Sequence, residues 1–225
     1  MLGSLCLVGL FVFDAAVLKV CSVFVSANFF LLSASCFFRW PGMWLKQRNG
    51  RLHPLGQVLL FPLRVLNSAS FIAATRIQKE APVDCVAPNI WLGRRMNSSE
   101  AIQQFGKAEL AVLDLTCEFS ESRYFARMPY LCLPTVDHTA PTQTALRAGV
   151  DFITANCRER KVYVHCALGH GRSATVVAAW LLADNPRLMV EAAIKQLQAI
   201  RPGVRLNSEQ RESLVNFTRE TQRPK

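Results

Sequence analysis

The stretch that decides the fold is VYVHCALGHGRS, residues 162–173. A β-branched and aromatic run ends at Cys166, a short glycine-containing loop follows, and Arg172 opens the helical pattern ATVVAAWLLAD. This order predicts a strand, a tight loop and a helix N-terminus, where free N–H groups and the helix dipole favour an anion. The same surroundings lower the pKa of a cysteine thiol. Arg172, six positions after Cys166, can fold back to bind phosphate through two N–H groups.

The residues around this loop resemble the cysteine-dependent protein tyrosine phosphatase superfamily, and its compact dual-specificity branch most closely. His165 precedes the cysteine, Gly169 and Gly171 lie in the loop, and Ser173 follows the arginine. The two glycines let the backbone turn its N–H groups inward as a phosphate nest. The resemblance covers roughly residues 85–219. A buried, inert cysteine would leave the glycines and the flanking order unexplained.

The resemblance implies a role for each loop residue. Cys166 is the nucleophile, Arg172 holds the phosphoryl oxygens, His165 supports the loop from behind, and Ser173 helps the thiolate leave. Transfer of a phosphoryl group needs its equatorial oxygens held in this way. The predicted phosphate-binding residues are Ala167, Leu168, Gly169, His170, Gly171 and Arg172.

A general acid must protonate the leaving oxygen. The family keeps an aspartate for this purpose in a separate loop about 30 residues before the cysteine, and YLCLPTVDHTAPT places Asp137 there. An ordinary turn or helix-entry aspartate is the alternative interpretation. His138 is a competing acid, whereas Asp114 at a strand end and Asp151 within a helix fit less well.

The rest of this region alternates strands with helices, which predicts an α/β domain with a mainly parallel sheet and helices on both faces. The Leu110–Leu115 run is almost wholly apolar, as in a buried strand. Other expected strands are 89–93, 130–133 and 162–164, and the expected helices are 98–105, 142–156, 172–184, 187–200 and one from Asn207.

The N-terminal third differs in composition. Residues 1–38 carry two charges, Asp14 and Lys19, and Val20 to Phe38 carries none. That uncharged run is about 28 Å long as a helix, close to the roughly 30 Å hydrocarbon core of a bilayer. We expect one membrane span, with Trp40 and Trp44 at the interface. A two-span hairpin that includes residues 2–13, a cleavable signal peptide and a buried soluble helix pair are the alternatives.

The charge pattern divides the chain into a membrane segment (1–39), a basic juxtamembrane linker (40–79) and a catalytic domain (80–225). Residues 39–79 carry seven basic residues and no acidic one, which places the phosphatase on the cytoplasmic side, at the inner or plasma membrane if the source is bacterial. Beside a membrane span, the basic run favours anionic lipid over nucleic acid. Residues 55–75 fit an interfacial helix, a second insertion or packing against the phosphatase.

No cofactor is expected. The four histidines are scattered and no C-x-x-C motif occurs, so the sequence predicts no metal site. The eight cysteines are irregularly spaced and fit free thiols in a reducing compartment. A protective disulfide between Cys166 and Cys85, Cys117 or Cys132, as in some relatives, is a further hypothesis.

These observations predict a membrane-anchored, cysteine-dependent phosphatase that acts through a phosphocysteine intermediate. The substrate is a phospholipid near the membrane or a protein carrying phosphotyrosine, phosphoserine or phosphothreonine. Phosphoinositide-type relatives often carry lysines within the loop, where this chain has Ala167 and His170. A non-catalytic protein that binds phosphorylated ligands and a rhodanese-like sulfurtransferase are the alternatives. The sequence leaves the oligomeric state open.

Overall fold

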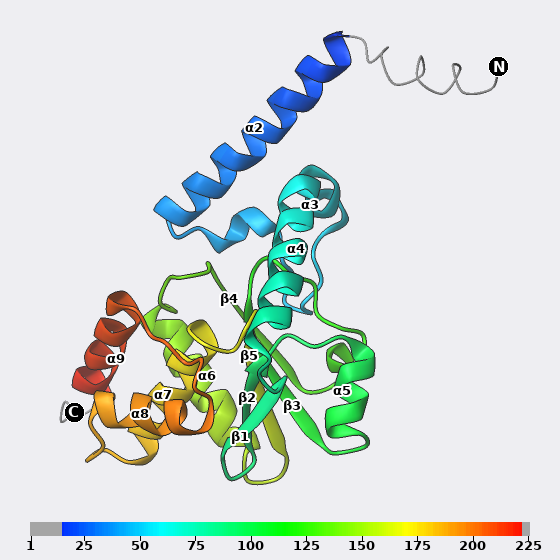
Figure 1. The fold of residues 1–225 in the computed structure, drawn as a ribbon. Coiled ribbons are helices and arrows are strands. Elements are labelled where there is room, and N and C mark those ends of the chain that lie inside the picture. The colour runs from blue at the N-terminus through cyan, green and yellow to red at the C-terminus, as the bar shows by residue number, and fades with distance from the viewer. Residues whose placement is uncertain (1–14, 222–225) are drawn as a thin grey trace.

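The computed structural model describes residues 15–221, and a five-stranded sheet lies at its centre (Figure 1). The strand order is β1 (Val83–Ala87), β2 (Ile90–Arg94), β5 (Lys161–Cys166), β3 (Leu110–Thr116) and β4 (Tyr130–Thr135). β1 runs antiparallel to β2, and the other neighbouring pairs are parallel. The predicted α/β fold with a mainly parallel sheet is confirmed.

Helices cover both faces of the sheet, as the apolar runs of its central strands require. Along β3 and β5, Leu113 and Val164 point into the core under the C-terminal helices, while Val112 and Tyr163 point to the other face. The first face carries α6 (Gln143–Asn156), α7 (Arg172–Asp184), α8 (Val190–Ile200) and α9 (Ser208–Thr221), and the second carries α5 (Ser98–Phe105) and the short η2 (Phe125–Arg127).

Two local features differ from the sequence-based expectation. β1 was not predicted, since its sequence VDCVA is short and half polar. Helix α8 begins at Val190 instead of residue 187. Helix α5 begins at Ser98 as expected, and Asn97 caps it: the Asn97 side chain accepts a hydrogen bond from the Glu100 N–H, and the Glu100 carboxylate accepts one from the Asn97 N–H.

Helix α2 (Ala15–Phe37) projects away from the sheet domain (Figure 1). Within residues 15–221, Val17–Phe37 is the one helix long and apolar enough to cross a membrane, and 11% of its most apolar stretch is buried in the molecule. The alternative of a two-span hairpin depends on residues 2–13, which lie outside the described residues.

The segment between α2 and the sheet packs against the domain. It forms η1 (Pro41–Trp44), α3 (Pro54–Leu59) and α4 (Phe61–Gln78). Met43, Trp44, Leu52, Leu60 and Leu63 share a buried cluster with Cys117 and Val136 of the sheet domain. Trp44 is thus a core residue and not an interface residue, whereas Trp40 is exposed and its place at a membrane interface stays a prediction.

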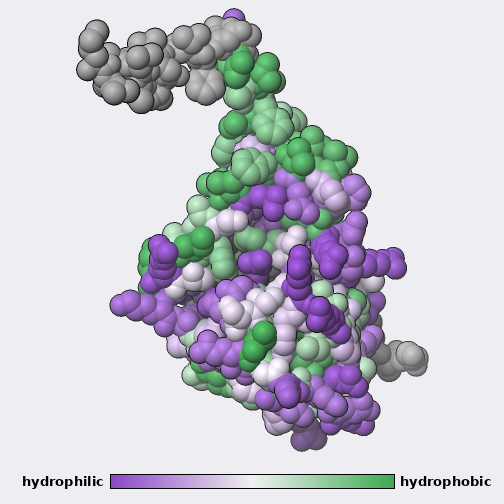
Figure 2. Space-filling model, turned by 90° about the vertical axis from the view of Figure 1, so that its right-hand side faces the viewer, coloured by the Kyte–Doolittle hydropathy of each residue, from purple (hydrophilic) through white to green (hydrophobic). Residues whose placement is uncertain are grey.

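Apolar side chains of this segment also remain on the surface. Leu55, Val58, Phe61, Val65 and Leu66 of α3 and α4 are each more than two-fifths exposed. Figure 2 shows hydrophobic residues gathered at the end of the molecule from which α2 projects, whereas the opposite end is mostly polar. Apolar residues are therefore exposed on α2 and also on α3 and α4.

Candidate active site

The thiol of Cys166 lies where β5 ends and the loop to α7 begins. Its Sγ accepts hydrogen bonds from the Gly169 N–H and the Ser173 hydroxyl, each at 3.3 Å. Burial alone would raise the pKa of this thiol, but the Arg172 guanidinium and the hydrogen bonds from Ser173 outweigh burial and lower it. Cys166 is therefore set up to ionise more readily than an ordinary cysteine.

The loop carbonyls, residues 167–171, are all held by groups behind the loop or in α7. Arg201 donates to Leu168 O at 2.9 Å and to Gly169 O at 3.2 Å. The backbone N–H groups of Arg95, Arg205 and Thr175 bond the carbonyls of Ala167, His170 and Gly171, respectively. With its acceptors engaged elsewhere, the loop offers N–H donors to an anion, as a phosphate nest does.

One of the two loop glycines is required by backbone conformation. Gly169 has a φ of +78°, and a Cβ there would lie 2.4 Å from the Gly93 carbonyl oxygen. Gly171 has a φ of −113°, outside the left-handed region, so the sequence-based argument for conformational freedom applies to Gly169 and not to Gly171.

Arg172 is buried and is held by the Glu118 side chain, which follows β3, and by the Thr135 backbone carbonyl at the end of β4. Its terminal nitrogens donate to both oxygens of Glu118 at 2.8 and 2.9 Å, and one of them donates to the Thr135 carbonyl at 2.9 Å. The Nε of Arg172 is buried without a partner among the described residues. A buried donor without a partner indicates a place for an acceptor such as a phosphate oxygen.

Asp137 lies above this arginine, 3.1 Å from its Nη2. It lines a cavity of about 650 Å³ together with Cys166, Arg172, His138 and His170. The predicted acid, nucleophile and phosphate-binding loop therefore meet in one cavity. His138 points largely into solvent, with its Nε2 3.8 Å from Asp137.

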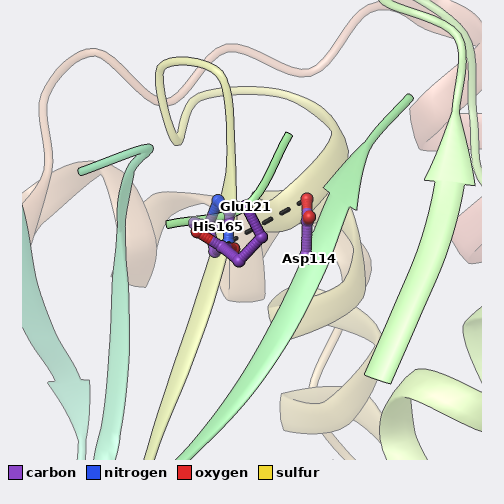
Figure 3. A group of neighbouring side chains, drawn as sticks. All are labelled: Asp114, Glu121 and His165. Carbon is purple, nitrogen blue, oxygen red and sulfur yellow. Dashed lines mark hydrogen bonds and ion pairs between the residues drawn. The ribbon is translucent and has the colours of Figure 1, made fainter. Parts of the chain in front are cut away.

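His165 joins a buried network behind the loop (Figure 3). Its Nε2 lies 2.8 Å from Glu121 and 3.9 Å from Asp114. Burial would lower the pKa of His165, but Glu121 and Asp114 raise it. Asp114 also bonds the ammonium of Lys46 at 2.5 Å and the Tyr130 hydroxyl at 2.6 Å. The predicted support of the loop by His165 thus has a defined chain of partners.

The same network resembles a metal site in composition, since Asp114, Glu121 and His165 each offer a ligand atom and these atoms lie within 4.8 Å of one another. The residues do not fit a metal ion, because the Lys46 ammonium already contacts Asp114 and both side chains are fully buried. Burial would lower the pKa of Lys46, but Asp114 raises it, so the amine supplies a fixed positive charge there.

The described cysteines, from Cys21 to Cys166, are free thiols. Burial raises the pKa of the Cys132 thiol to about 12 and that of Cys117 well above its usual range. Cys166 differs from both in having a cation and a hydroxyl donor beside it. A protective disulfide with one of the other cysteines stays a prediction.

Sequence reasoning missed the residues that hold the site in place. None of the four buried residues that hold the site was singled out. They are Glu118, Glu121, Lys46 and Arg201, which contact Arg172, His165, Asp114 and the loop carbonyls, respectively. The available signal was the segment LDLTCEFSE, in which carboxylates follow a wholly apolar strand. A carboxylate at such a place needs a partner, but the sequence does not say which cation reaches it.

A thiol of lowered pKa, a nest of N–H groups and a buried arginine form a site for cysteine-dependent chemistry on phosphate. The comparison with protein families agrees: residues 90–220 match the model of the dual specificity phosphatase catalytic domain. The chain therefore belongs to the dual-specificity phosphatase family.

Curated relatives share the central part of the chain. It is 38% identical over 94 residues to phosphatidylglycerophosphate phosphatase PTPMT2 of Arabidopsis thaliana, covering 41% of each chain. It is 37% identical over 106 residues to the phosphatidylglycerophosphatase and protein-tyrosine phosphatase 1 of Mus musculus, covering 46% of this chain and 54% of that protein. The chain thus spans about two-fifths to one-half of these relatives' length.

Solved structures agree with the fold. The crystal structure of PTPMT1 in complex with PI(5)P superposes with a TM-score of 0.56 at 25% identity, over 63% of this chain and 97% of that chain. The active form of Tk-PTP gives a TM-score of 0.55 at 26% identity, over 61% and 97%.

Proposed function

We propose that this protein hydrolyses phosphate monoesters through a phosphocysteine formed on Cys166. One observation carries the proposal. The Cys166 thiol, with its lowered pKa, lies at the base of a loop whose carbonyls are all hydrogen-bonded, next to a buried arginine whose Nε has no partner among residues 15–221. That arrangement supplies a nucleophile and donors for phosphate in one place.

In the first step, the Cys166 thiolate attacks phosphorus and the ester P–O bond breaks. The loop N–H groups and Arg172 hold the three remaining oxygens, on which negative charge spreads. A phosphoryl group bound there would replace Asp137 on the Arg172 nitrogen that it contacts at 3.1 Å. Protonated Asp137 then gives its proton to the departing alkoxide.

In the second step, water attacks the phosphocysteine and Asp137 takes the proton from that water. The S–P bond breaks, inorganic phosphate leaves, and the thiolate returns to the hydrogen bonds of Ser173 and Gly169, both at 3.3 Å. Glu118 acts by positioning, since its two bonds fix the plane of the Arg172 guanidinium.

The proposed substrate is a phospholipid that carries a single phosphate monoester. The relatives named for phosphatidylglycerophosphate support this class, as does the apolar helix α2 beside the site. His170 would be the loop's extra cation for a second phosphate, but its Nε2 is 2.5 Å from Glu80, whose carboxylate offsets that charge. A multiply phosphorylated headgroup therefore fits less well.

The mouse relative's name also includes protein-tyrosine phosphatase, which supports a phosphoprotein as the second candidate substrate. Family membership favours both candidates over a sulfurtransferase. A purely binding role is disfavoured because Cys166, Arg172 and Asp137 line one cavity.

For the location we propose that the segment 1–39 is an integral membrane anchor and that 80–225 is the catalytic domain on the cytoplasmic side. The basic segment 40–79 would lie along the membrane while packed on that domain. The length and exposure of Val17–Phe37 support the anchor. The excess of basic residues after it supports the orientation.

Phosphate release by the full chain in detergent micelles or vesicles tests the function. The substrates are phosphatidylglycerophosphate, a phosphotyrosine peptide and an aryl phosphate, and Cys166→Ser is the control. We expect release that depends on Cys166 and is fastest on the lipid. Release fastest on the peptide would transfer the assignment to phosphoproteins. Folded protein that releases no phosphate from any substrate would refute the hydrolase.

A further inference from the structure

A second cavity, of about 220 Å³, lies between α2, α4 and the active-site loop. Leu32 and Cys36 of α2 form one wall, and Asn67, Ser70, Phe71 and Ala74 of α4 form another. The segment that was predicted to be a linker therefore builds part of a hollow next to the phosphate site.

The two cavities share a wall. Asp137, Ala167 and Leu168 line both of them. Ala167 and Leu168 immediately follow Cys166 in the loop, and Asp137 is the proposed acid. A single ligand whose phosphate lies in the loop can therefore place the atoms next to that phosphate in the second cavity.

The chemistry of the second cavity differs from that of the first. Its walls are largely apolar. Of its two charged residues, Asp137 also lines the first cavity, and Glu118 is already bonded through both oxygens to Arg172. Asn67 and Ser70 offer polar groups at the α4 side. A volume of about 220 Å³ is below the roughly 300–1,000 Å³ of whole-ligand pockets, so it suits one part of a larger ligand.

The place of this cavity in the molecule identifies that ligand. One wall belongs to α2, the helix long and apolar enough to span a membrane, and exposed apolar residues such as Phe29 and Phe30 continue along the same helix. Exposed Val65 and Leu66 lie on α4. Figure 2 shows this end of the molecule to be hydrophobic. An apolar chain leaving the cavity would thus remain against apolar surface and the bilayer.

We infer that the cavity between α2 and α4 is a subsite for the glycerol and proximal acyl part of a membrane phospholipid monoester. This inference rests on the proposed function and adds how the substrate is selected. The phosphate occupies the loop at Cys166, and the acyl-bearing part lies between the membrane helix and α4. Lipid enters from the side of the membrane, without leaving it completely.

Two neighbouring alanines of α4 provide a matched test. Ala74 lines the cavity, whereas Ala73 is exposed and does not line it. Ala74→Trp fills the cavity and Ala73→Trp adds the same side chain outside it. Both variants of the full chain are assayed in vesicles containing phosphatidylglycerophosphate and, separately, on a soluble aryl phosphate.

We expect Ala74→Trp to lower the ratio of lipid to aryl kcat/KM by about tenfold or more, the usual effect of losing apolar contacts in a pocket. Ala73→Trp should leave that ratio at the wild-type value. Equal ratios in the two variants would overturn the inference. If the wild type shows no Cys166-dependent phosphate release on any substrate, the proposed function is refuted instead.

A measurement on the wild type keeps the inference testable if Ala74→Trp does not fold. Phosphatidylglycerophosphates with short acyl chains of increasing length are assayed below their micelle concentrations. The inference requires kcat/KM to rise with chain length and then level off once the cavity is filled. A flat series, with release still dependent on Cys166, would contradict the subsite and leave the hydrolase intact.

Discussion

Replacing Lys46 by methionine should destabilise the catalytic domain, although this residue lies 120 positions before the nucleophile in a segment predicted to be a linker. Its ammonium is 2.5 Å from Asp114 Oδ2, 2.6 Å from Thr116 Oγ1 and 2.8 Å from Thr116 O. Both members of the ion pair are fully buried. Methionine keeps the length and removes the charge, which leaves the Asp114 carboxylate without its cation.

Removing one partner of a buried ion pair costs about 3–5 kcal/mol. At about 2–4 °C per kcal/mol for a chain of this size, the melting temperature should fall by roughly 6–20 °C. The assay is thermal unfolding of the full chain in detergent, followed by tryptophan fluorescence. Lys195→Met is the matched control, because Lys195 lies exposed on α8 and should change stability by about 0.5 kcal/mol at most.

The double variant Lys46→Met/Asp114→Asn isolates the pair. Because the two groups touch, its loss should be smaller than the sum of the single losses by about 0.5–3 kcal/mol. If Lys46→Met melts within the error of Lys195→Met, segment 40–79 is not part of the folded domain and the reasoning is refuted.

Three further predictions concern the site itself. Ser173→Ala removes a hydrogen bond that lowers the pKa of Cys166, so alkylation of that thiol by iodoacetamide should shift to higher pH; an unchanged profile would contradict this. Asp137→Asn should lower kcat about 10²–10⁴-fold on an alkyl phosphate, and much less on an aryl phosphate with a good leaving group. A loss of less than tenfold on the alkyl ester would mean that another residue is the acid. Burial would lower the pKa of His165, but Glu121 and Asp114 outweigh burial and raise it. The charged form of His165 therefore stabilises the fold below a pH of about 6.5, and this stability is lost as the pH rises through the raised pKa. Melting temperature should therefore fall with rising pH more steeply in the wild type than in Glu121→Gln, and parallel curves would contradict the assignment.

The loop and its flanking elements could be predicted because their signals are local. Residues 162–173 contain the strand, the turn and the helix start in one continuous stretch. Gly169 is required where the backbone enters the left-handed region against Gly93. Asp137 could be placed in the same cavity as Cys166 because its distance along the chain from that cysteine resembles the family pattern.

The supports of the loop could not be predicted in the same way. Arg201 reaches the loop carbonyls from the end of α8, and Lys46 reaches Asp114 from before the first strand. These partners are set by tertiary packing, and no periodicity or spacing indicates them. The basic composition of segment 40–79 favoured a solvated or lipid-facing stretch. The Lys46 side chain in that segment is nevertheless buried, because the Asp114 carboxylate of the apolar strand β3 needs a cation.

The most direct test of the account is to trap the covalent intermediate. Full-length protein in vesicles is mixed with phosphatidylglycerophosphate labelled in its terminal phosphate, quenched within the first turnover and digested for mass mapping. The account predicts a labelled phosphate on the peptide that contains Cys166, and none in Cys166→Ser. Turnover of the lipid with no label on Cys166 at any quench time would contradict it.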